Sequence, residues 1–325
     1  MARAELSRRQ LLRLLGASGA AAVLAPVLSG CASPFRDVRI AIATGGTQGV
    51  YYTLGGALAD IWQDQLRLAA RPQVLPTAGS VQNLTLLASG SADIAFSQVD
   101  TIADLLSETA ADDPRAPRAL ARIYDDVVHV VVRADSRFHR LADLRGARVS
   151  IGAKDSGVEP IARRLLATAG LNPERDVQPI RFGINESVEA MRSDTIDAFF
   201  WSGGLPTRGV SDLAATVPIR LLDLGDVRGL VRAAYPVYSA GTVPASSYGI
   251  PEPVSTLLVR NFLLVPASMR ADLAEALTGA LFAEQPRLRA ASPAALTIDA
   301  RAAIGTQPVA LHRGAQRFYR STKSF

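Results

Sequence analysis

The sequence contains few of the residues on which enzyme chemistry and disulfide scaffolds depend. It has one cysteine, Cys31, and three histidines, His129, His139 and His312, in 325 residues. A single cysteine cannot form an intramolecular disulfide or a cysteine-rich zinc site. The histidines lie far apart, without partners at a metal-ligand spacing. His129 stands inside an apolar run, where a hydrogen-bonded structural role competes with a catalytic one.

Common catalytic and nucleotide-binding motifs are also absent. The sequence has no HExxH, no GxSxG and no phosphate-loop lysine, and GGTQG at 45–49 does not match the dinucleotide fingerprint. We therefore expect no catalytic residues, no metal and no cofactor, and we do not expect an enzyme.

Basic residues are numerous but scattered. Only two of the 35 basic residues are lysine, Lys154 and Lys323. The full chain carries a net charge of +5, of which residues 1–30 contribute +3 through four arginines and one glutamate. The remainder is close to neutral and has no basic run, which gives little support to nucleic-acid binding.

The N-terminus resembles an export signal. Ser7–Arg13 is basic and contains an arginine pair, and the apolar run Leu14–Leu28 is shorter than a membrane span. Leu28-Ser29-Gly30-Cys31 resembles a lipoprotein cleavage box. We expect 1–30 to be a twin-arginine-like signal peptide, Cys31 to carry lipid outside the cytoplasmic membrane, and 31–35 to be a linker. A short membrane anchor and the general export route remain alternatives.

After this segment, short apolar runs alternate with segments of helical period, which is typical of an α/β protein with mainly parallel strands. The expected strands are 38–43, 73–75, 93–97, 127–133, 148–152, 177–182, 197–201, 219–223 and 255–265. The expected helices include 49–66, 81–88, 158–169 and 187–192.

Four of the expected strand-to-helix turns are rich in glycine and hydroxyl residues. They lie at 44–49, 77–80, 153–157 and 202–206. Helix starts leave backbone N–H groups free and attract anions, and in a parallel sheet they lie at the edge where ligands bind. Ordinary capping by Ser80 and Ser156 would explain two of the turns without a ligand.

In these segments the sequence resembles the TAXI-type solute-binding proteins of TRAP transporters. TGGTQGVYYTLGGALA at 44–59 resembles the first block of that family, TAGSVQNL at 77–84 the second, and SADIAFSQVD at 91–100 the third. Residues 125–133 and 141–149, then 195–200 and the tail LHRGAQRFY at 311–319, follow in the same order. The resemblance covers nearly the whole chain after the signal.

This resemblance implies a two-lobed periplasmic-binding-protein fold of type II-like architecture, with two crossover hinge segments. Lobe one would comprise 36–129 and 240–325, and lobe two 130–239. Such a protein closes by hinge motion around a small carboxylate, an amino acid such as glutamate, and delivers it to a TRAP-type membrane permease. A sensor that presents its loaded form to a membrane receptor kinase remains the alternative.

The family pattern also implies a set of ligand-binding residues. They are Gly45, Gly46, Thr47, Tyr51, Tyr52, Ser80, Asn83, Gln98, Asp100, Ser156, Gly157, Trp201 and Gly204. Glycine N–H groups and the Thr47 hydroxyl would meet a carboxylate, and Asp100 would meet an ammonium group. Asp100 could instead cap a helix, Trp201 could pack at the hinge, and one of the adjacent tyrosines is expected in the core.

The sequence departs from the family at 154–158. Lys154-Asp155-Ser156-Gly157-Val158 stands where the family commonly has a glycine- and serine-rich run that ends in threonine. We expect Lys154 to be a surface residue, with binding to an anionic solute as the alternative. Arg122, Arg133 and Arg181 lie near strand ends and are candidates to pair with a side-chain carboxylate, although surface positions are expected for each.

Overall fold

The computed structural model describes residues 33–110 and 112–322, and residues 35–325 form one compact unit. The predicted signal peptide and Cys31 lie outside the described residues. Within residues 33–110 and 112–322, no helix is long and apolar enough to cross a membrane.

The compact unit is built around one ten-stranded sheet in the order β2-β1-β3-β10-β4-β7-β5-β6, with β8 paired to β4 and β9 to β10. Its strands are β1 (Ala41–Ala43), β2 (Gln73–Leu75), β3 (Ile94–Gln98), β4 (Pro117–Arg133), β5 (Arg148–Ser150), β6 (Gln178–Ile180), β7 (Ala198–Gly203), β8 (Ile219–Leu221), β9 (Ser239–Val243) and β10 (Val254–Pro266).

The α-helices flank this sheet. They are α2 (Val50–Leu66), α3 (Ser80–Ser89), α4 (Val99–Glu108), α5 (Val158–Thr168), α6 (Ile184–Arg192), α7 (Arg208–Ala214), α8 (Gly225–Ala234), α9 (Ala271–Ala283), α10 (Gln285–Ala291), α11 (Ala300–Ala303) and α12 (Arg313–Thr322). Short 3₁₀ helices span Leu141–Leu144 and Pro293–Thr297.

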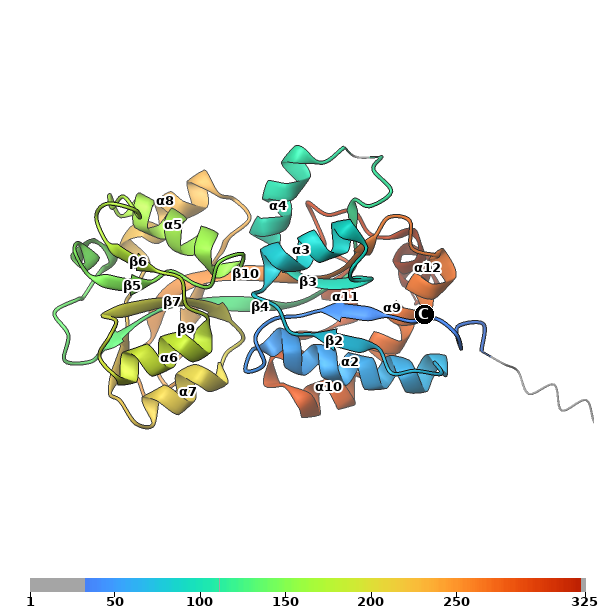
Figure 1. Ribbon diagram of the computed structural model, residues 1–325, viewed down its shortest axis with the longest axis horizontal. Coiled ribbons are helices and arrows are strands. Elements are labelled where there is room, and N and C mark those ends of the chain that lie inside the picture. Colours follow the sequence, from blue (N-terminus) through green and yellow to red (C-terminus); the bar gives the residue numbers. More distant parts are fainter. Residues whose placement is uncertain (1–32, 111, 323–325) are drawn as a thin grey trace, which may run out of the picture. The chain divides into compact units, whose positions relative to one another are not determined.

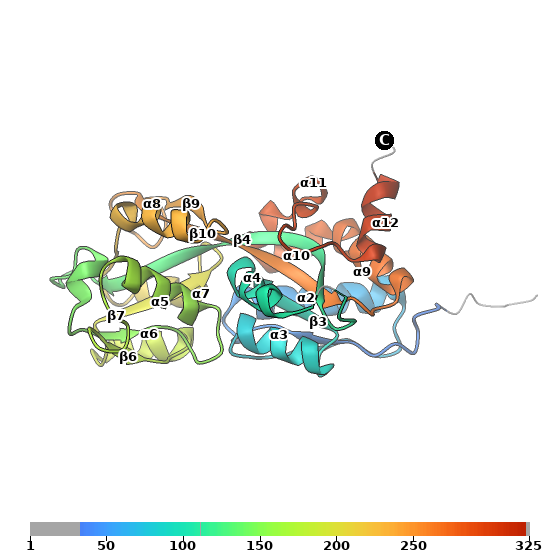
Figure 2. The same ribbon diagram turned by 90° about the horizontal axis from the view of Figure 1, so that it is seen from above.

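Two lobes share the sheet (Figure 1). We call β1–β3 with α2–α4 and α9–α12 the first lobe, and β5–β8 with α5–α8 the second. Strands β4 and β10 run through both (Figure 2). At about 3.4 Å per residue, the 17 residues of β4 span roughly 55 Å, which is long enough to belong to both lobes.

The predicted α/β fold is confirmed. Pairing is parallel within β2-β1-β3 and within β6-β5-β7, as expected from the alternating strands and helices. The pairings of β4 and β10 are antiparallel, because these strands cross between the lobes in opposite directions. The expected lobe boundaries at 129/130 and 239/240 stay predictions. Val243 and Ile250, which follow the second of these boundaries, pack in the core of the second lobe.

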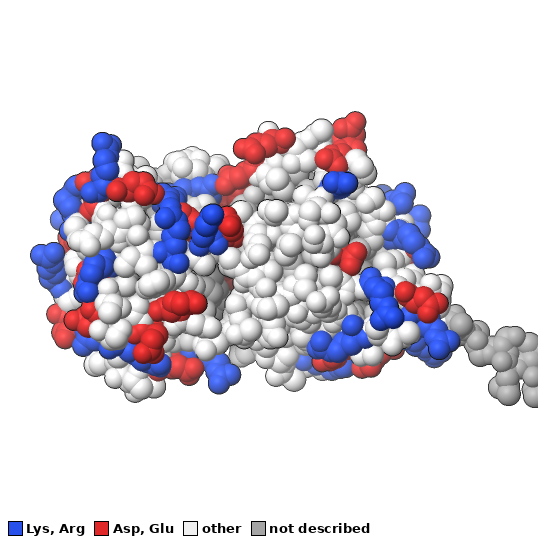
Figure 3. All heavy atoms as spheres, in the orientation of Figure 1, with Lys and Arg blue, Asp and Glu red and all other residues white. Residues whose placement is uncertain are grey.

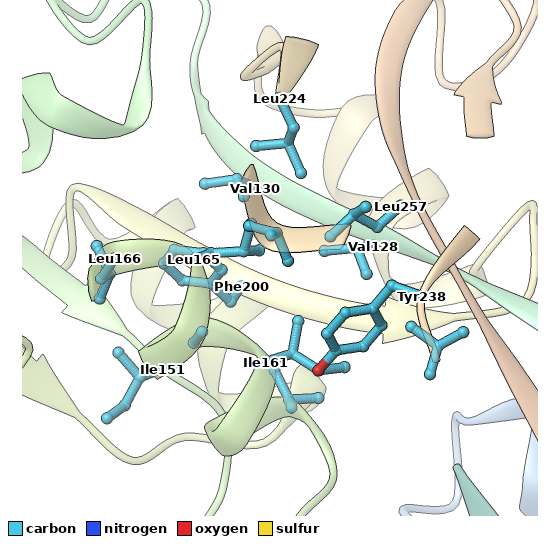
Figure 4. Close-up of a cluster of buried hydrophobic side chains, with 14 of the residues drawn as sticks. Val128, Val130, Ile151, Ile161, Leu165, Leu166, Phe200, Leu224, Tyr238 and Leu257 are labelled. Carbon is cyan, nitrogen blue, oxygen red and sulfur yellow. The ribbon is translucent and has the colours of Figure 1, made fainter. Parts of the chain in front are cut away.

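Amphipathic helices bury the faces of the sheet. In α5, Ile161, Ala162, Leu165 and Leu166 recur at helical spacing and are at most 1% exposed. Figure 4 shows Ile161, Leu165 and Leu166 beside the apolar side chains of the crossing strands. On the face seen in Figure 3, basic and acidic side chains are interspersed.

Candidate functional site

A small cavity lies where four helices begin. Its volume is about 60 Å³, and the residues that line it come from both lobes. The N-cap residues of α2, α3, α4 and α5, which are Gly49, Gly79, Gln98 and Gly157, all line it, and none of them caps its helix with a side chain. Helix starts carry partial positive charge. The fold therefore brings four positive helix ends to one space.

Backbone donors are free at this cavity. The amides of Val50, Ser80 and Val158, the first residues of α2, α3 and α5, donate no hydrogen bond within the described residues. No Lys, Arg or His side chain is among the lining residues. A negative group in this cavity would be bound by main-chain N–H groups and hydroxyls, as at other helix starts.

Two glycines allow the lobes to meet here. A Cβ on Gly157 would lie 1.9 Å from Gln98 Oε1 and 2.8 Å from Ser80 Oγ, so only glycine fits without displacing these two first-lobe side chains. Gly79 has φ +130°, a conformation that L side chains rarely adopt, and it lies against the backbone of Ser156 and Gly157. The glycine turns thus provide close contact between lobes as well as exposed backbone.

A buried polar cluster forms one wall of the cavity. Gln98 Nε2 donates to Asp126 Oδ2 and to Ser202 Oγ, both at 2.7 Å, and Ser202 Oγ lies 3.3 Å from Asp126 Oδ2. The three residues come from β3, β4 and β7. The crossing strand β4 therefore carries a carboxyl group into the space between the lobes.

Asp126 has no cationic partner among the residues that the structure describes. It is 2% exposed, and burial raises its pKa to about 7, although hydrogen bonding by Gln98, Asn261, Ser202 and Tyr124 opposes that rise. Its Oδ1 has no hydrogen bond of regular geometry. Gln98 Oε1 and Ser156 Oγ also lack a hydrogen-bond partner in the described part of the chain. Because carboxylate and amide oxygens are acceptors, they suit a ligand that brings N–H or O–H donors.

Tyrosines complete the wall. The hydroxyl of Tyr51 donates to Asn261 Oδ1 and lies 3.4 Å from Ser80 Oγ. Ser80 Oγ in turn accepts a 3.1 Å hydrogen bond from the backbone N–H of Gln98. Burial raises the pKa of Tyr51 and of Tyr124 well above the usual range, so both phenols stay protonated.

Residues 42–322 match the NMT1-like family. The chain belongs to the NMT1-like family.

Solved structures similar to this NMT1-like protein show its fold. A periplasmic transporter has 13% identity and a TM-score of 0.55, covering 90% of this chain and 94% of that one. A Bordetella bronchiseptica RB50 protein has 21% identity and a TM-score of 0.52, covering 86% and 84%. A Xanthomonas citri protein bound to a chloride ion has 17% identity and a TM-score of 0.52, covering 87% and 99%. The NMT1-like chain thus has a periplasmic-binding-protein fold.

The structure brings eight of the residues expected from the sequence to the cavity of this NMT1-like protein. They are Gly45, Gly46, Tyr51, Ser80, Gln98, Ser156, Gly157 and Trp201. Trp201 lines the cavity and also donates from Nε1 to Thr207 Oγ1 at 3.0 Å; its role in ligand binding stays a prediction.

Five expected residues lie elsewhere. Thr47 and Tyr52 face a separate hollow beside α10. Thr47 lies in the turn before α2, and adjacent residues of a helix point in different directions, which separates Tyr52 from Tyr51. Gly204 packs against Val50 and Ala294. Asn83 is fully buried and donates to the backbone carbonyl groups of Thr44 and Phe96. Asp100 does not face the cavity, and its carboxylate pairs with Arg164 and Tyr238.

Sequence reasoning missed Tyr124, Asp126 and Ser202, which line the cavity, and Asn261, which contacts Tyr51. The expected strand began at 127, so Asp126 was not recognised as a strand residue. A carboxyl group within a long apolar strand is itself a signal, because aspartate is almost never fully buried without a partner.

The remaining candidates are at the surface or in internal contacts. Arg122 pairs with Asp125, Arg133 with Asp135 and Arg181 with Glu159, and Lys154 is exposed. His129 is buried, and burial lowers its pKa to about 4. Over residues 33–110 and 112–322, no cluster of three or more metal-ligating side chains occurs.

Proposed function

We propose that this NMT1-like protein is an extracytoplasmic solute-binding protein that captures a small carboxylate, an amino acid such as glutamate, in the cavity between its lobes. The observation that carries the proposal is the convergence of four helix N-termini, without side-chain caps, on one cavity. Free N–H groups and helix dipoles stabilise a carboxylate there without a basic side chain.

The opposite wall suits an ammonium group. Among the described residues, Asp126 Oδ1 accepts no hydrogen bond of regular geometry and Gln98 Oε1 accepts none, whereas an ammonium group offers three donors. A buried carboxylate is costly unless it is paired with a cation. A zwitterion would therefore place its carboxylate at the helix ends and its ammonium group at Asp126. Asp126 takes the role that the sequence had suggested for Asp100.

The cavity volume limits the ligand in this arrangement. About 60 Å³ is well below the roughly 150 Å³ of a cavity that holds benzene. A compact amino acid fits this space better than glutamate, which would require the lobes to move apart. Such hinge opening is the usual motion of two-lobed binding proteins.

Membership of the TAXI group, delivery to a TRAP-type permease and lipid anchoring through Cys31 are also part of the proposal. They are supported by the collinear sequence blocks and by the basic, apolar and small-residue pattern of residues 1–31. The protein would then act outside the cytoplasmic membrane, at its periplasmic face.

Thermal unfolding against a panel of small solutes tests the proposal. The panel pairs amino acids with their hydroxy- and keto-acid counterparts and includes dicarboxylates. A ligand at one hundred times its dissociation constant stabilises the folded state by about 2.7 kcal/mol, or roughly 5–10 °C at this size. We expect amino acids to raise the unfolding temperature. No shift with any carboxylate, for protein shown by native mass spectrometry to be free of ligand, would contradict the proposal.

A further inference from the structure

Arg164 of α5 connects the second lobe to the first. Its Nη1 lies 3.0 Å from Asp100 Oδ2, and its Nη2 lies 2.6 Å from Asp104 Oδ2, both on α4. The other salt bridges among the described residues stay within one lobe, so these two are the only ones there that join the lobes.

Tyrosines of the second lobe enclose this contact. The Tyr238 hydroxyl donates to Asp100 Oδ2 at 2.7 Å and accepts from Arg164 Nη1 at 2.8 Å. The ring of Tyr235 lies 4.6 Å from the Arg164 guanidinium carbon, within the range of a cation–π contact. Figure 4 shows the Tyr238 ring near Ile161, with its hydroxyl as the polar end. We call Asp100, Asp104, Arg164, Tyr235 and Tyr238 the interlobe cluster.

The Asp100–Arg164 pair at the centre of the interlobe cluster is buried, whereas the Asp104 side chain is 58% exposed, and the cluster is separate from the ligand cavity. The Asp100 side chain is 0% exposed and that of Arg164 is 13% exposed, and no member of the cluster lines the cavity. Asp100 nevertheless follows the cavity residue Gln98 by two positions, and Arg164 lies in the helix that begins at Gly157. The contact therefore holds α4 against α5 just beyond the point where Gln98 and Gly157 meet.

We propose that the interlobe cluster holds the lobes together around the cavity, which makes Arg164 a positioning residue for solute binding. When a buried ion pair loses one partner, the charge of the other is left buried without compensation, and this raises the free energy of the closed arrangement of the lobes. Opening the lobes would expose the remaining charged group to water and remove this free-energy cost. Loss of either partner therefore shifts the population towards open lobes and lowers the apparent affinity in proportion to the closed fraction.

The interlobe distance tests this without a ligand. Spin labels on Ser91→Cys and Glu189→Cys, both exposed, report the separation of the lobes once Cys31 is replaced by serine. We expect Arg164→Met and Asp100→Asn to move the distance distribution of the ligand-free protein to longer values. Arg163→Met is the matched control, since Arg163 pairs with Glu159 and Glu174 within its own lobe. A distribution for Arg164→Met equal to that of the control would overturn the proposal.

Affinity provides the second readout, and it rests on the proposed function because it requires the solute found in the thermal panel. We expect Arg164→Met to weaken binding at least tenfold while leaving the ranking of solutes unchanged. Tyr238→Phe, which removes one hydroxyl, should weaken binding less and serves if Arg164→Met does not fold. Unchanged affinity in both variants would contradict the positioning role. If no solute binds at all, the proposed function fails, and the interlobe distance still decides the role of the cluster.

Discussion

Two buried aspartates, Asp100 and Asp126, differ in what neutralises them. They are 1% and 2% exposed, and burial raises the pKa of both. Asp100 has the Arg164 guanidinium 3.0 Å away and the Tyr238 hydroxyl at 2.7 Å. Asp126 is contacted only by uncharged groups, among them Gln98 and Ser202, within the described part of the chain.

This difference distinguishes a carboxylate that is paired within the protein from one that we propose binds the solute. The charge of Asp100 is neutralised within the protein by Arg164, so this aspartate can join the lobes. Asp126 would be charged at a cost in an enclosed space unless a cation enters. In the proposed function, one aspartate joins α4 to α5 and the other would bind the solute between the lobes.

The largest effect concerns stability against pH. The folded-state pKa of Asp126, about 7, is above its ordinary value of 3.8. The folded state therefore holds a proton that the unfolded chain releases, and the unfolding free energy falls as pH rises from about 4 to about 7. The loss is on the order of 4 kcal/mol. Denaturant titrations of the ligand-free wild type and Asp126→Asn should diverge across this range, since the variant lacks the titrating group. Asp100 contributes in the same direction to both proteins, so parallel curves would show that Asp126 keeps an ordinary pKa.

A smaller effect is expected from Gly157→Ala. Its Cβ would lie 1.9 Å from Gln98 Oε1, and Gln98 is held by two hydrogen bonds to Asp126 and Ser202. We expect a loss of roughly 1–3 kcal/mol in the unfolding free energy, typical of overpacking. Gly229→Ala in α8 is the control, because its Cβ would meet no atom within 4 Å. Equal stability of the two variants would mean that the lobes do not meet closely at Gly157.

The smallest effect is expected at Thr47, which the sequence placed in one site with Ser80. Ser80→Ala removes the acceptor of the buried backbone N–H of Gln98 and should lower the unfolding free energy by about 1–3 kcal/mol. Thr47 is exposed, and its side chain makes no hydrogen bond within the described residues. Thr47→Ala should therefore leave the unfolding free energy unchanged and the solute affinity within twofold of the wild type. A large loss of affinity in Thr47→Ala would show that Thr47 belongs to the binding site and would contradict its position outside the cavity.

The sequence predicted the fold well because its strongest signals are local. Glycine-rich turns after apolar runs located the starts of α2, α3 and α5 within one residue, and these starts do meet at one cavity. The partners of the two aspartates could not be predicted in this way. Arg164 is 64 residues from Asp100, and nothing in its helical pattern distinguishes it from Arg163, which stays within its lobe. Asp126 escaped notice because β4 begins ten residues before the apolar run that indicated it.

The most direct test compares an amino acid with its 2-hydroxy-acid counterpart by calorimetry, on the wild type and on Asp126→Asn at pH 8. The two solutes share the carboxylate that the helix ends would bind and differ only at the group that would meet Asp126. We predict that the wild type prefers the amino acid by at least about 100-fold, or about 2.7 kcal/mol, and that Asp126→Asn loses this preference. Equal affinity of the wild type for both solutes, or an unchanged preference in Asp126→Asn, would contradict the assignment of Asp126 as the ammonium-binding group.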